Sequence, residues 1–390
     1  MAESAAKRSS VGKDLTSGPI FKLLLMFAVP MVLANLLQQL YSMVDLMVIG
    51  KYVGSTGTVG VSTGGEVADL VAPMAMGFSA TGQIYIAQLW GAKDERHIKS
   101  TVGTLLTFMM LLSALLGLIA ICFSGPILRL INCPAEAFGK ARSYMIITAL
   151  GFPAIFGYNA VCGILRGMGD SQKPLIFIAI ATVINIVGDV ILVVAFKLDA
   201  AGTAIATIAS QYGSFIASLV YLYRHEDRFG FRMRLSTMKI DKGELAVLCK
   251  LGIPQVIRSS LVRFSLLWVN GNINAYGLTV SATNSIGNKI QKFADVFYSS
   301  IDQGAGAMIG QNLGARKHDR AAKTTWAALA MGTAAAAIIT LFVWTIPDKL
   351  VGIFTGDAAV IEMGVVYLHI MTIHFFASAF VGSSISERFF

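Results

Sequence analysis

The chain has 390 residues, of which 55% are hydrophobic and only 14% are charged, and its formal net charge is +9. This apolar share exceeds what a soluble domain of that size needs, and it predicts an all-α polytopic membrane protein. The positive charge does not indicate a nucleic-acid partner, because the basic residues lie in short connections between apolar runs, where they orient a membrane protein. The segment before the first run is polar and basic, and that run is too long for a cleaved signal peptide.

Ten apolar runs are long enough to be candidate membrane spans, since about 20 residues of helix cross the hydrocarbon layer. They lie at about 21–50, 58–89, 101–124, 141–166, 174–196, 202–223, 246–275, 279–309, 323–346 and 363–386.

Basic residues gather in alternate connections between these runs. They are Lys7, Arg8, Lys13 and Lys22 at the amino terminus, Lys93, Arg96 and Lys99 in the second connection, Arg166 and Lys173 in the fourth, Arg224, Arg228, Arg232, Arg234, Lys239 and Lys242 in the sixth, and Arg316, Lys317 and Arg320 in the eighth. The third connection is an exception, with Arg129, Lys140 and Arg142. The pattern predicts a cytoplasmic amino terminus in a bacterial-type inner (cytoplasmic) membrane.

The two halves of the chain repeat. Gln88-Leu-Trp-Gly91-Ala92-Lys93 reappears as Gln311-Asn-Leu-Gly314-Ala315-Arg316, 223 residues later (311 − 88). Tyr144 matches Tyr367 at the same offset, and Pro30 matches Pro254 at 224. Because an even number of helices separates the copies, we expect two parallel-repeat helical bundles related by an axis along the membrane normal.

This repeat divides the chain into four parts. We predict a cytoplasmic tail at 1–18, an amino-terminal lobe of six helices at 19–223, a cytoplasmic linker at 224–243 and a carboxy-terminal lobe at 244–390. Six plus six helices are expected, but about ten are present, because Phe390 matches Gly167 at the end of the fourth helix. We therefore expect a truncated chain, and the alternative is a lobe of four helices.

The first run contains a carboxylate, Asp45, near its outer end. An acid inside a membrane span costs about 2.5–3.5 kcal/mol on insertion scales, so such residues are candidates for function. The alternative is an interfacial aspartate near Lys51 that merely ends the helix.

Three polar side chains are predicted at nearly one depth. Asp45 lies about 9 Å below Lys51, and Asp189 lies about 12 Å below Lys197, at 1.5 Å per residue. Thr207 lies five residues past Gly202, near the outer end of the next helix, which runs back inward.

Two further polar residues share helical faces with these acids. Tyr41 precedes Asp45 by four residues, and Asn185 precedes Asp189 by four. Hard oxygen ligands suit a small cation, and two close carboxylates equally suit a shared proton. Alternatively, the amide and the hydroxyl of Thr207 only cross-link helices, as polar residues in membranes often do.

A second acidic pair lies in the second run. Glu66 and Asp69 are three residues apart and share a face, so they are candidates for lining the same cavity. They could instead hydrogen-bond locally to Ser62 or Thr63.

The seventh and eighth runs differ from the first half because they contain bases. Their charged residues are Arg258, Arg263, Lys289, Lys292, Asp295 and Asp302. One interpretation is that an arginine pairs with Asp295 across adjacent helices while the lysines snorkel. The other is that unpaired bases face the cavity and favour an anionic or zwitterionic cargo.

Several motifs together resemble the multidrug and toxic compound extrusion (MATE) family, over essentially the whole chain. They are Leu-Tyr-Ser-Met-Val-Asp45 with Ile49-Gly50, Gln88-Leu-Trp-Gly91-Ala92, Arg166-Gly-Met-Gly169-Asp170-Ser-Gln-Lys-Pro174, Asn185-Ile-Val-Gly-Asp189 and Ile309-Gly-Gln-Asn-Leu-Gly314-Ala315.

The resemblance implies two six-helix bundles around a central cavity and export of organic cations driven by Na⁺ or H⁺. It also implies that Asp45, Asn185, Asp189 and Thr207 hold the coupling ion, Na⁺ if the protein is Na⁺-coupled, with Tyr41 nearby. Some family members carry a coupling acid on the seventh helix, but Ile257 to Leu267 has none here.

We therefore predict a secondary antiporter that exports organic, cationic, drug-like compounds in exchange for Na⁺ or H⁺. The alternative is a transporter or flippase of an anionic, zwitterionic or lipid-linked substrate that uses the basic carboxy-terminal lobe. We expect no cofactor beyond the coupling ion, partners limited to a small molecule and membrane lipid, and a monomer.

An enzyme is disfavoured because no nucleophile or metal cluster is evident. His369 and His374 do not share a helical face, and no phosphate-binding loop with a Gly-Lys-Ser/Thr ending is present. A receptor would not need two acids at one depth.

Overall fold

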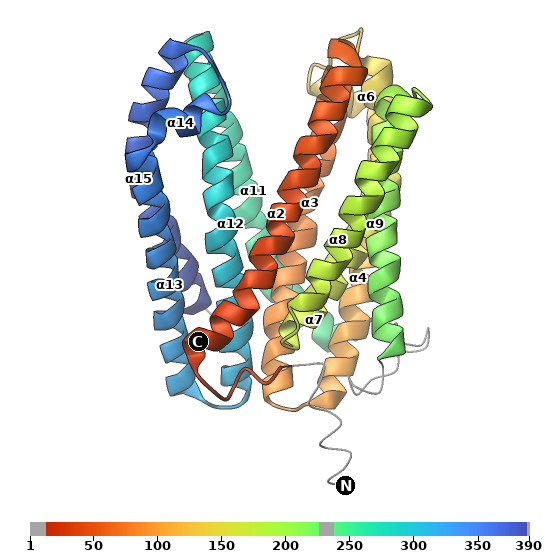
Figure 1. Ribbon diagram of the computed structural model, residues 1–390. Helices are drawn as coiled ribbons and strands as arrows, with labels where there is room; N and C mark the ends of the chain where they lie inside the picture. The colour runs from red at the N-terminus through yellow and green to blue at the C-terminus, as the bar shows by residue number, and fades with distance from the viewer. Residues whose placement is uncertain (1–12, 226–237, 388–390) are drawn as a thin grey trace.

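The computed structural model describes residues 13–225 and 238–387, and all regular structure in these ranges is helical (Figure 1). Lys7 and Arg8 of the predicted tail, and Arg228, Arg232 and Arg234 of the predicted linker, lie outside the described residues. The predicted lobe boundaries therefore stay predictions.

Within residues 13–225, the first half contains eight α-helices and one π-helical turn. They are α2 (Ile20–Tyr52), α3 (Gly54–Gly91), α4 (Glu95–Cys122), α5 (Ser124–Leu130), α6 (Phe138–Leu150), α7 (Phe152–Gly167), α8 (Gln172–Asp189), the π-helical turn (Val190–Ala195) and α9 (Asp199–Arg224). The second half contains α11 (Lys242–Asn274), α12 (Leu278–Gly314), α13 (His318–Thr345), α14 (Pro347–Gly352) and α15 (Ala358–Glu387).

Helices occupy all ten predicted runs, which confirms the all-α membrane fold. Among the described residues, eight helices are long and apolar enough to cross a membrane, or nine if α6 and α7 form one bent span. The predicted span at 279–309 is the exception. Its helix α12 is long but polar, and it packs against helices of both halves, so much of its surface faces protein rather than lipid.

The predicted span at 141–166 is broken into α6 and α7, which bend by 42°. Pro153 at the start of α7 has no N–H for the preceding turn, which favours a break. Gly151 at the break lies against Ile208, and a Cβ there would be 2.9 Å from Ile208 Cγ1. The bend therefore lets α9 approach closely.

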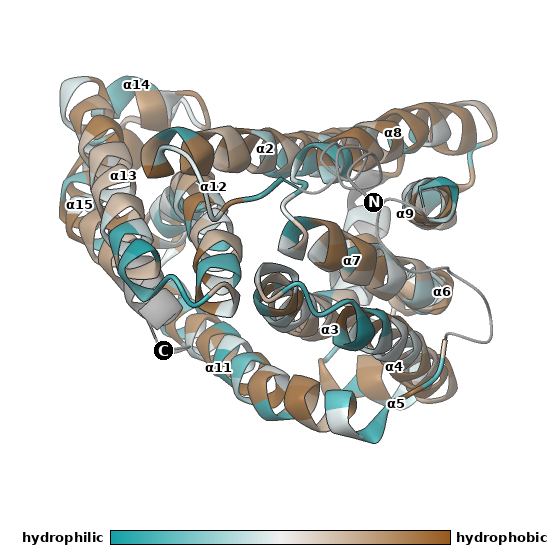
Figure 2. Ribbon diagram, turned by 90° about the horizontal axis from the view of Figure 1, so that it is seen from below, coloured by the Kyte–Doolittle hydropathy of each residue, from teal (hydrophilic) through white to brown (hydrophobic). Residues whose placement is uncertain are grey.

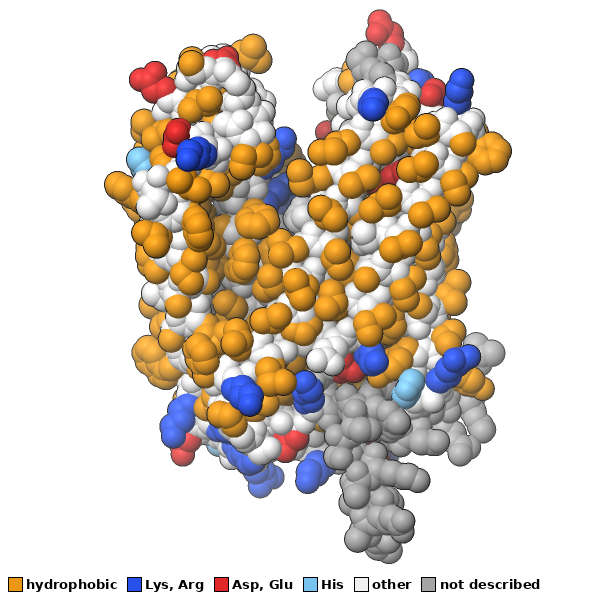
Figure 3. All heavy atoms as spheres, in the orientation of Figure 1, with side chains coloured by type: hydrophobic (Ala, Val, Ile, Leu, Met, Phe, Trp, Pro, Cys, Tyr) orange, Lys and Arg blue, Asp and Glu red, His pale blue; other side chains and the backbone are white. Residues whose placement is uncertain are grey.

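The helices form two groups that meet at one end and diverge at the other (Figure 1). We call the end that holds residue 13 and the α12–α13 turn the basal end, and the opposite end the open end. Side chains fill the basal end, whereas a recess separates the groups at the open end (Figure 3).

The first helix of each half crosses from one group to the other. The basal half of α2 packs on α12 and α13 through Leu24, Phe27 and Met31, whereas Tyr41 in its other half packs on α8. Figure 1 shows α2 running diagonally between the groups, and Figure 2 shows from below that it reaches from α13 toward α8. By the same pattern, α11 packs along α3 and α4.

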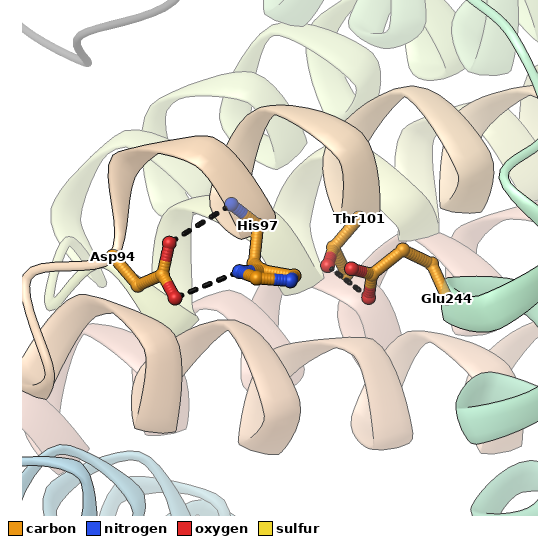
Figure 4. A network of polar contacts seen from close by, with 4 residues as sticks. All are labelled: Asp94, His97, Thr101 and Glu244. Carbon is orange, nitrogen blue, oxygen red and sulfur yellow. Dashed lines mark hydrogen bonds and ion pairs between the residues drawn. The ribbon is translucent and has the colours of Figure 1, made fainter.

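Polar contacts hold the basal end of α11 against α4 (Figure 4). Asp94 caps α4 by accepting from His97 N at 3.1 Å, and this bond holds the pKa of Asp94 below its ordinary value. One turn further, Thr101 Oγ1 donates to Glu244 of α11 at 2.8 Å. Glu244 is buried, so this bond satisfies a carboxylate that would otherwise be costly to bury.

The repeated glycine motifs pack against each other at the basal end. Gly91 lies against the carbonyl oxygen of Gln311, and Gly314 lies against the carbonyl oxygen of Gln88. Only a hydrogen fits at either position. The sequence repeat is thus a reciprocal backbone contact between the two groups.

We expect Gly91→Ala and Gly314→Ala each to lower the stability of the protein, because the new methyl group would push a carbonyl of the other group away. The expected loss is about 1–3 kcal/mol, typical of overpacking. The measurement is thermal unfolding in detergent. Gly125→Ala is the control, since nothing lies within 4 Å of the position of its Cβ, and unchanged stability in all three variants would contradict the contact.

Candidate functional site

Three helices bring the predicted ion-site residues together near the open end. Asp45 of α2 lies within interaction distance of Asp189 and Asn185 of α8 and of Thr207 of α9. Tyr41, one turn before Asp45, is buried against α8 and also interacts with Asp45. The predicted convergence of these five side chains is therefore present in the fold.

Six side-chain polar atoms of this cluster are buried without hydrogen-bond partners among the described residues. Asp189 is 0% exposed and Asn185 is 1% exposed. Within the described residues, both side-chain polar atoms of each lack a partner, as do Asp45 Oδ1 and Thr207 Oγ1. Buried polar groups are normally satisfied, so this concentration of unsatisfied polar atoms makes the cluster a candidate ligand site.

The local backbone explains why α9 reaches α8. Gly188, next to Asp189, faces Ala206, and a Cβ there would lie 3.0 Å from Ala206 Cβ. Directly after Asp189 the backbone continues as a π-helical turn. Such turns are rare in proteins and are frequent at functional sites.

The cluster has two carboxylates and no compensating base. No lysine or arginine in the described part of the chain is among the groups that act on Asp45 or Asp189. Two carboxylates, an amide oxygen and a hydroxyl are hard ligands, which suit a small cation such as Na⁺. Without a cation, a shared proton would relieve the repulsion between the two acids.

No group of three or more histidine, cysteine, aspartate or glutamate side chains that could hold a metal is found among residues 13–225 and 238–387.

Thr203 is a second buried threonine of α9 that the sequence analysis did not single out. It lies one turn before Thr207 on α9, is buried, and its hydroxyl has no partner in the described structure. The spacing of four residues between these two threonines was the available signal.

The two acids of the second pair, Glu66 and Asp69, have different surroundings. Asp69 Oδ2 accepts from Arg263 of α11 at 2.7 Å, with side chains 65% and 38% exposed. Glu66 is exposed. Burial, together with the charge of Glu66, raises the pKa of the Cys133 thiol in the connection between α5 and α6. Neither acid is among the groups that interact with Asp45.

The expectation that an arginine pairs with Asp295 is wrong. Arg263 pairs with Asp69, because α11 runs along α3 rather than lying fully within the second group. Asp295 instead lies 3.7 Å from His374 Nε2 of α15, which also contacts Gln291.

The three other bases predicted on the seventh and eighth helices are exposed, and one of them has an aromatic partner. The Lys289 ammonium lies over the ring of Phe354, 5.6 Å from its centroid. Arg258 and Lys292 are exposed. Basic side chains are visible where the second group borders the recess (Figure 3).

Arg166 is not a loop cation, as its place in the predicted connection suggests, but lies in the last turn of α7. Its Nη1 donates to Gln303 Oε1 of α12 at 3.0 Å, and Gln83 Nε2 of α3 donates to the Gln303 carbonyl at 2.8 Å. These bonds join the two groups.

A sequence profile of the MatE family matches residues 30–191 and 254–385. The chain is 28% identical over 343 residues to the probable multidrug resistance protein YoeA of Bacillus subtilis, covering 87% of this chain and 74% of that protein. It is 24% identical over 353 residues to the multidrug export protein MepA of Staphylococcus aureus, covering 90% and 77%.

Two solved structures share the fold. An outward-facing multidrug resistance MATE transporter superimposes with a TM-score of 0.87 at 18% identity, over 95% of this chain and 83% of that one. A transporter from Pyrococcus furiosus, described as having a binding pocket of reverse polarity, superimposes with a TM-score of 0.83 at 19% identity, over 96% and 85%.

We expect Na⁺, compared with choline at equal ionic strength, to raise the melting temperature of the protein if the cluster binds Na⁺. At a hundredfold excess over the dissociation constant the stabilisation is about 2.7 kcal/mol. Asp45→Asn should abolish this shift, whereas Asp199→Asn, an exposed acid paired with Lys140, should keep it. If the wild type responds neither to Na⁺ nor to acidification, the cluster is not an ion or proton site.

Proposed function

Because the chain belongs to the MatE family of efflux transporters, we propose that it is a secondary antiporter. It exports organic, cationic, drug-like compounds in exchange for Na⁺ or H⁺. The observation that carries this proposal is the cluster of buried, unpartnered oxygens contributed by Asp45, Asn185, Asp189 and Thr207. YoeA and MepA, by their names, support a drug-like cargo.

The proposed orientation places the basal end in the cytoplasm of a cell bounded by a bacterial-type inner membrane. The basal connections contain Lys93, Arg96 and Arg316, which supports this orientation by the positive-inside rule. The recess then opens to the outside, where Na⁺ or H⁺ is available at the electrochemical potential that drives export.

The helix α2 links the ion cluster to the opening of the protein. Its outer half carries Asp45 and Tyr41 and packs on α8, whereas its basal half packs on α12 and α13. Neutralising Asp45 and Asp189 removes their repulsion and permits closer packing of α2 on α8. A shift of the outer half of α2 toward α8 thereby reaches the basal half of the same helix and its contacts with α12 and α13.

Coupling requires that the ion and the cargo bind unequally to the two orientations of the protein. A ligand can shift the equilibrium only by its difference in affinity between the states. We propose that the neutralised cluster favours the state that releases cargo outward. The protein acts as a monomer and needs no cofactor beyond the coupling ion.

A second candidate function is transport of an anionic, zwitterionic or lipid-linked cargo. The exposed bases Arg258 and Lys292 support it, as does the ion pair of Arg263 with Asp69, in which both charges remain partly exposed. A zwitterion could satisfy both charges of that pair. The reversed pocket polarity of the Pyrococcus furiosus transporter is a precedent within the fold.

We expect Asp45→Asn and Asp189→Asn each to abolish ion-driven efflux while the protein stays folded, because a neutral amide cannot take up and release the charge that drives the cycle. The measurement is dye efflux from proteoliposomes under an imposed Na⁺ or H⁺ gradient. Asp199→Asn is the matched control and should transport normally. Wild-type efflux in either cluster variant would defeat the mechanism.

If the cargo is anionic, we expect Arg258→Ala to lower transport of anionic relative to cationic compounds by about tenfold, equivalent to ~1.4 kcal/mol. Arg258 is preferred to Arg263 for this test, since truncating Arg263 would leave Asp69 without its partner. Competition assays with both cargo classes measure the ratio. An unchanged ratio removes the second candidate.

A further inference from the structure

A short amino-terminal segment lies between the two helix groups at the basal end. We call Lys13–Ser17 the strap. We propose that the strap, through Leu15 and the side chain of Gln311, holds the basal contacts closed and must leave its place before that end can open. The inference rests on the alternating opening of the proposed function, and it assigns positioning roles to residues outside the ion cluster.

The backbone of the strap is bonded to the second group. Leu15 N donates to Gln311 Oε1 at 3.0 Å, and Asn312 Nδ2 donates to the Leu15 carbonyl at 3.3 Å. Lys317 Nζ donates to the Thr16 carbonyl at 2.9 Å and to Thr16 Oγ1 at 3.2 Å. Both backbone groups of Leu15 are therefore satisfied by α12.

The side chain of Leu15 anchors the strap. It is 1% exposed and belongs to the apolar cluster that includes Leu24 of α2, Met308 of α12 and Ala321 of α13. Full burial of a leucine side chain stabilises the folded state by more than a single backbone hydrogen bond does. The strap thus has a hydrophobic anchor in addition to its polar contacts.

The strap also touches the first group. Gly169, in the turn between α7 and α8, has a φ of +88° and lies directly against the Lys13 carbonyl, so no side chain could be accommodated there. Gln311 Nε2 donates to the Gly167 carbonyl at 3.1 Å. The amide of Gln311 therefore joins the strap on one side and the end of α7 on the other.

The strap has a turn that holds its shape. Asp14 accepts from Thr16 N at 2.8 Å, from Thr16 Oγ1 at 2.6 Å and from Ser17 Oγ at 3.0 Å. Although partial burial opposes it, these bonds and nearby Lys317 hold the pKa of Asp14 below its ordinary value. The carboxylate therefore stays ionised and keeps the turn.

Opening of the basal end would break this arrangement. Separating the groups parts Gly91 from Gln311 and Gln311 from Gly167, so the strap must give up either its contact with Gly169 or its bonds to α12. The glycine contacts between the repeats do not need the strap. It is an added element that stabilises the basal-closed state seen here.

The test measures the basal distance directly, without transport. Spin labels at Lys99 of α4 and Lys323 of α13, both exposed, report the separation of the groups in full-length protein whose four cysteines are replaced. In Leu15→Asp, we expect the ratio of basal-open to basal-closed populations to rise about tenfold, because a charge replaces the buried anchor. Lys317→Gln, a milder change, should raise it in the same direction.

Two matched variants complete the design. Lys242→Gln makes the same exchange as Lys317→Gln at an exposed position at the start of α11, outside the strap, and should leave the distances unchanged. Gln311→Ala removes the amide that joins both groups, and should also increase the open population. If Gln311→Ala shifts the distances but Leu15→Asp and Lys317→Gln do not, the strap is not a latch. If none shifts them, the proposal also fails.

The outcomes are distinguishable from failure of the proposed function. The label distances report basal opening whether the coupling ion is Na⁺ or H⁺ and whatever the cargo is. A strap variant that opens the basal end in a protein without ion-driven efflux would support the latch and overturn only the antiport proposal.

Discussion

The structure depends on one electrostatic constraint, which is that a buried carboxylate and a half-buried one lie together without a base to balance them. Asp45 and Asp189 lie on different helices, and the oxygens around them lack partners within the described residues. Removing such charges from water is costly unless a proton or a cation compensates them. Asp45 is on α2, which packs on both helix groups. A proton or cation that balances its charge therefore acts on a helix that both groups contact.

The contacts that close the basal end are of a kind that can be broken repeatedly. They are close backbone approaches at Gly91 and Gly314 together with hydrogen bonds of Gln83, Arg166 and Gln311. Hydrogen bonds of this type contribute about 0.5–1.5 kcal/mol each on balance, or about 1.5–3 kcal/mol where the donor is charged, as in Arg166. Many modest contacts give a specific fit that can separate and form again.

The two helix groups differ in charge. Because α11 packs along α3, it brings charged residues from the two halves of the chain together. Arg263 belongs to the second half of the chain, yet its partner Asp69 is on α3 of the first half. No lysine or arginine in the described part of the chain is among the groups that act on Asp45 or Asp189, so the bases of the second half do not neutralise the acidic cluster of the first.

The sequence by itself determined the helices and the repeat, because a membrane requires apolar helices of a minimum length and glycine is needed where backbones touch. It also predicted which residues of α2, α8 and α9 converge, since the spacing of four residues and the depth along each helix are local properties. Only the tertiary structure decided the partners of Arg263, Asp295 and Arg166 and the burial of Leu15. Those depend on how helices cross, which is set by packing between residues far apart in the chain and leaves no periodic signal in either segment.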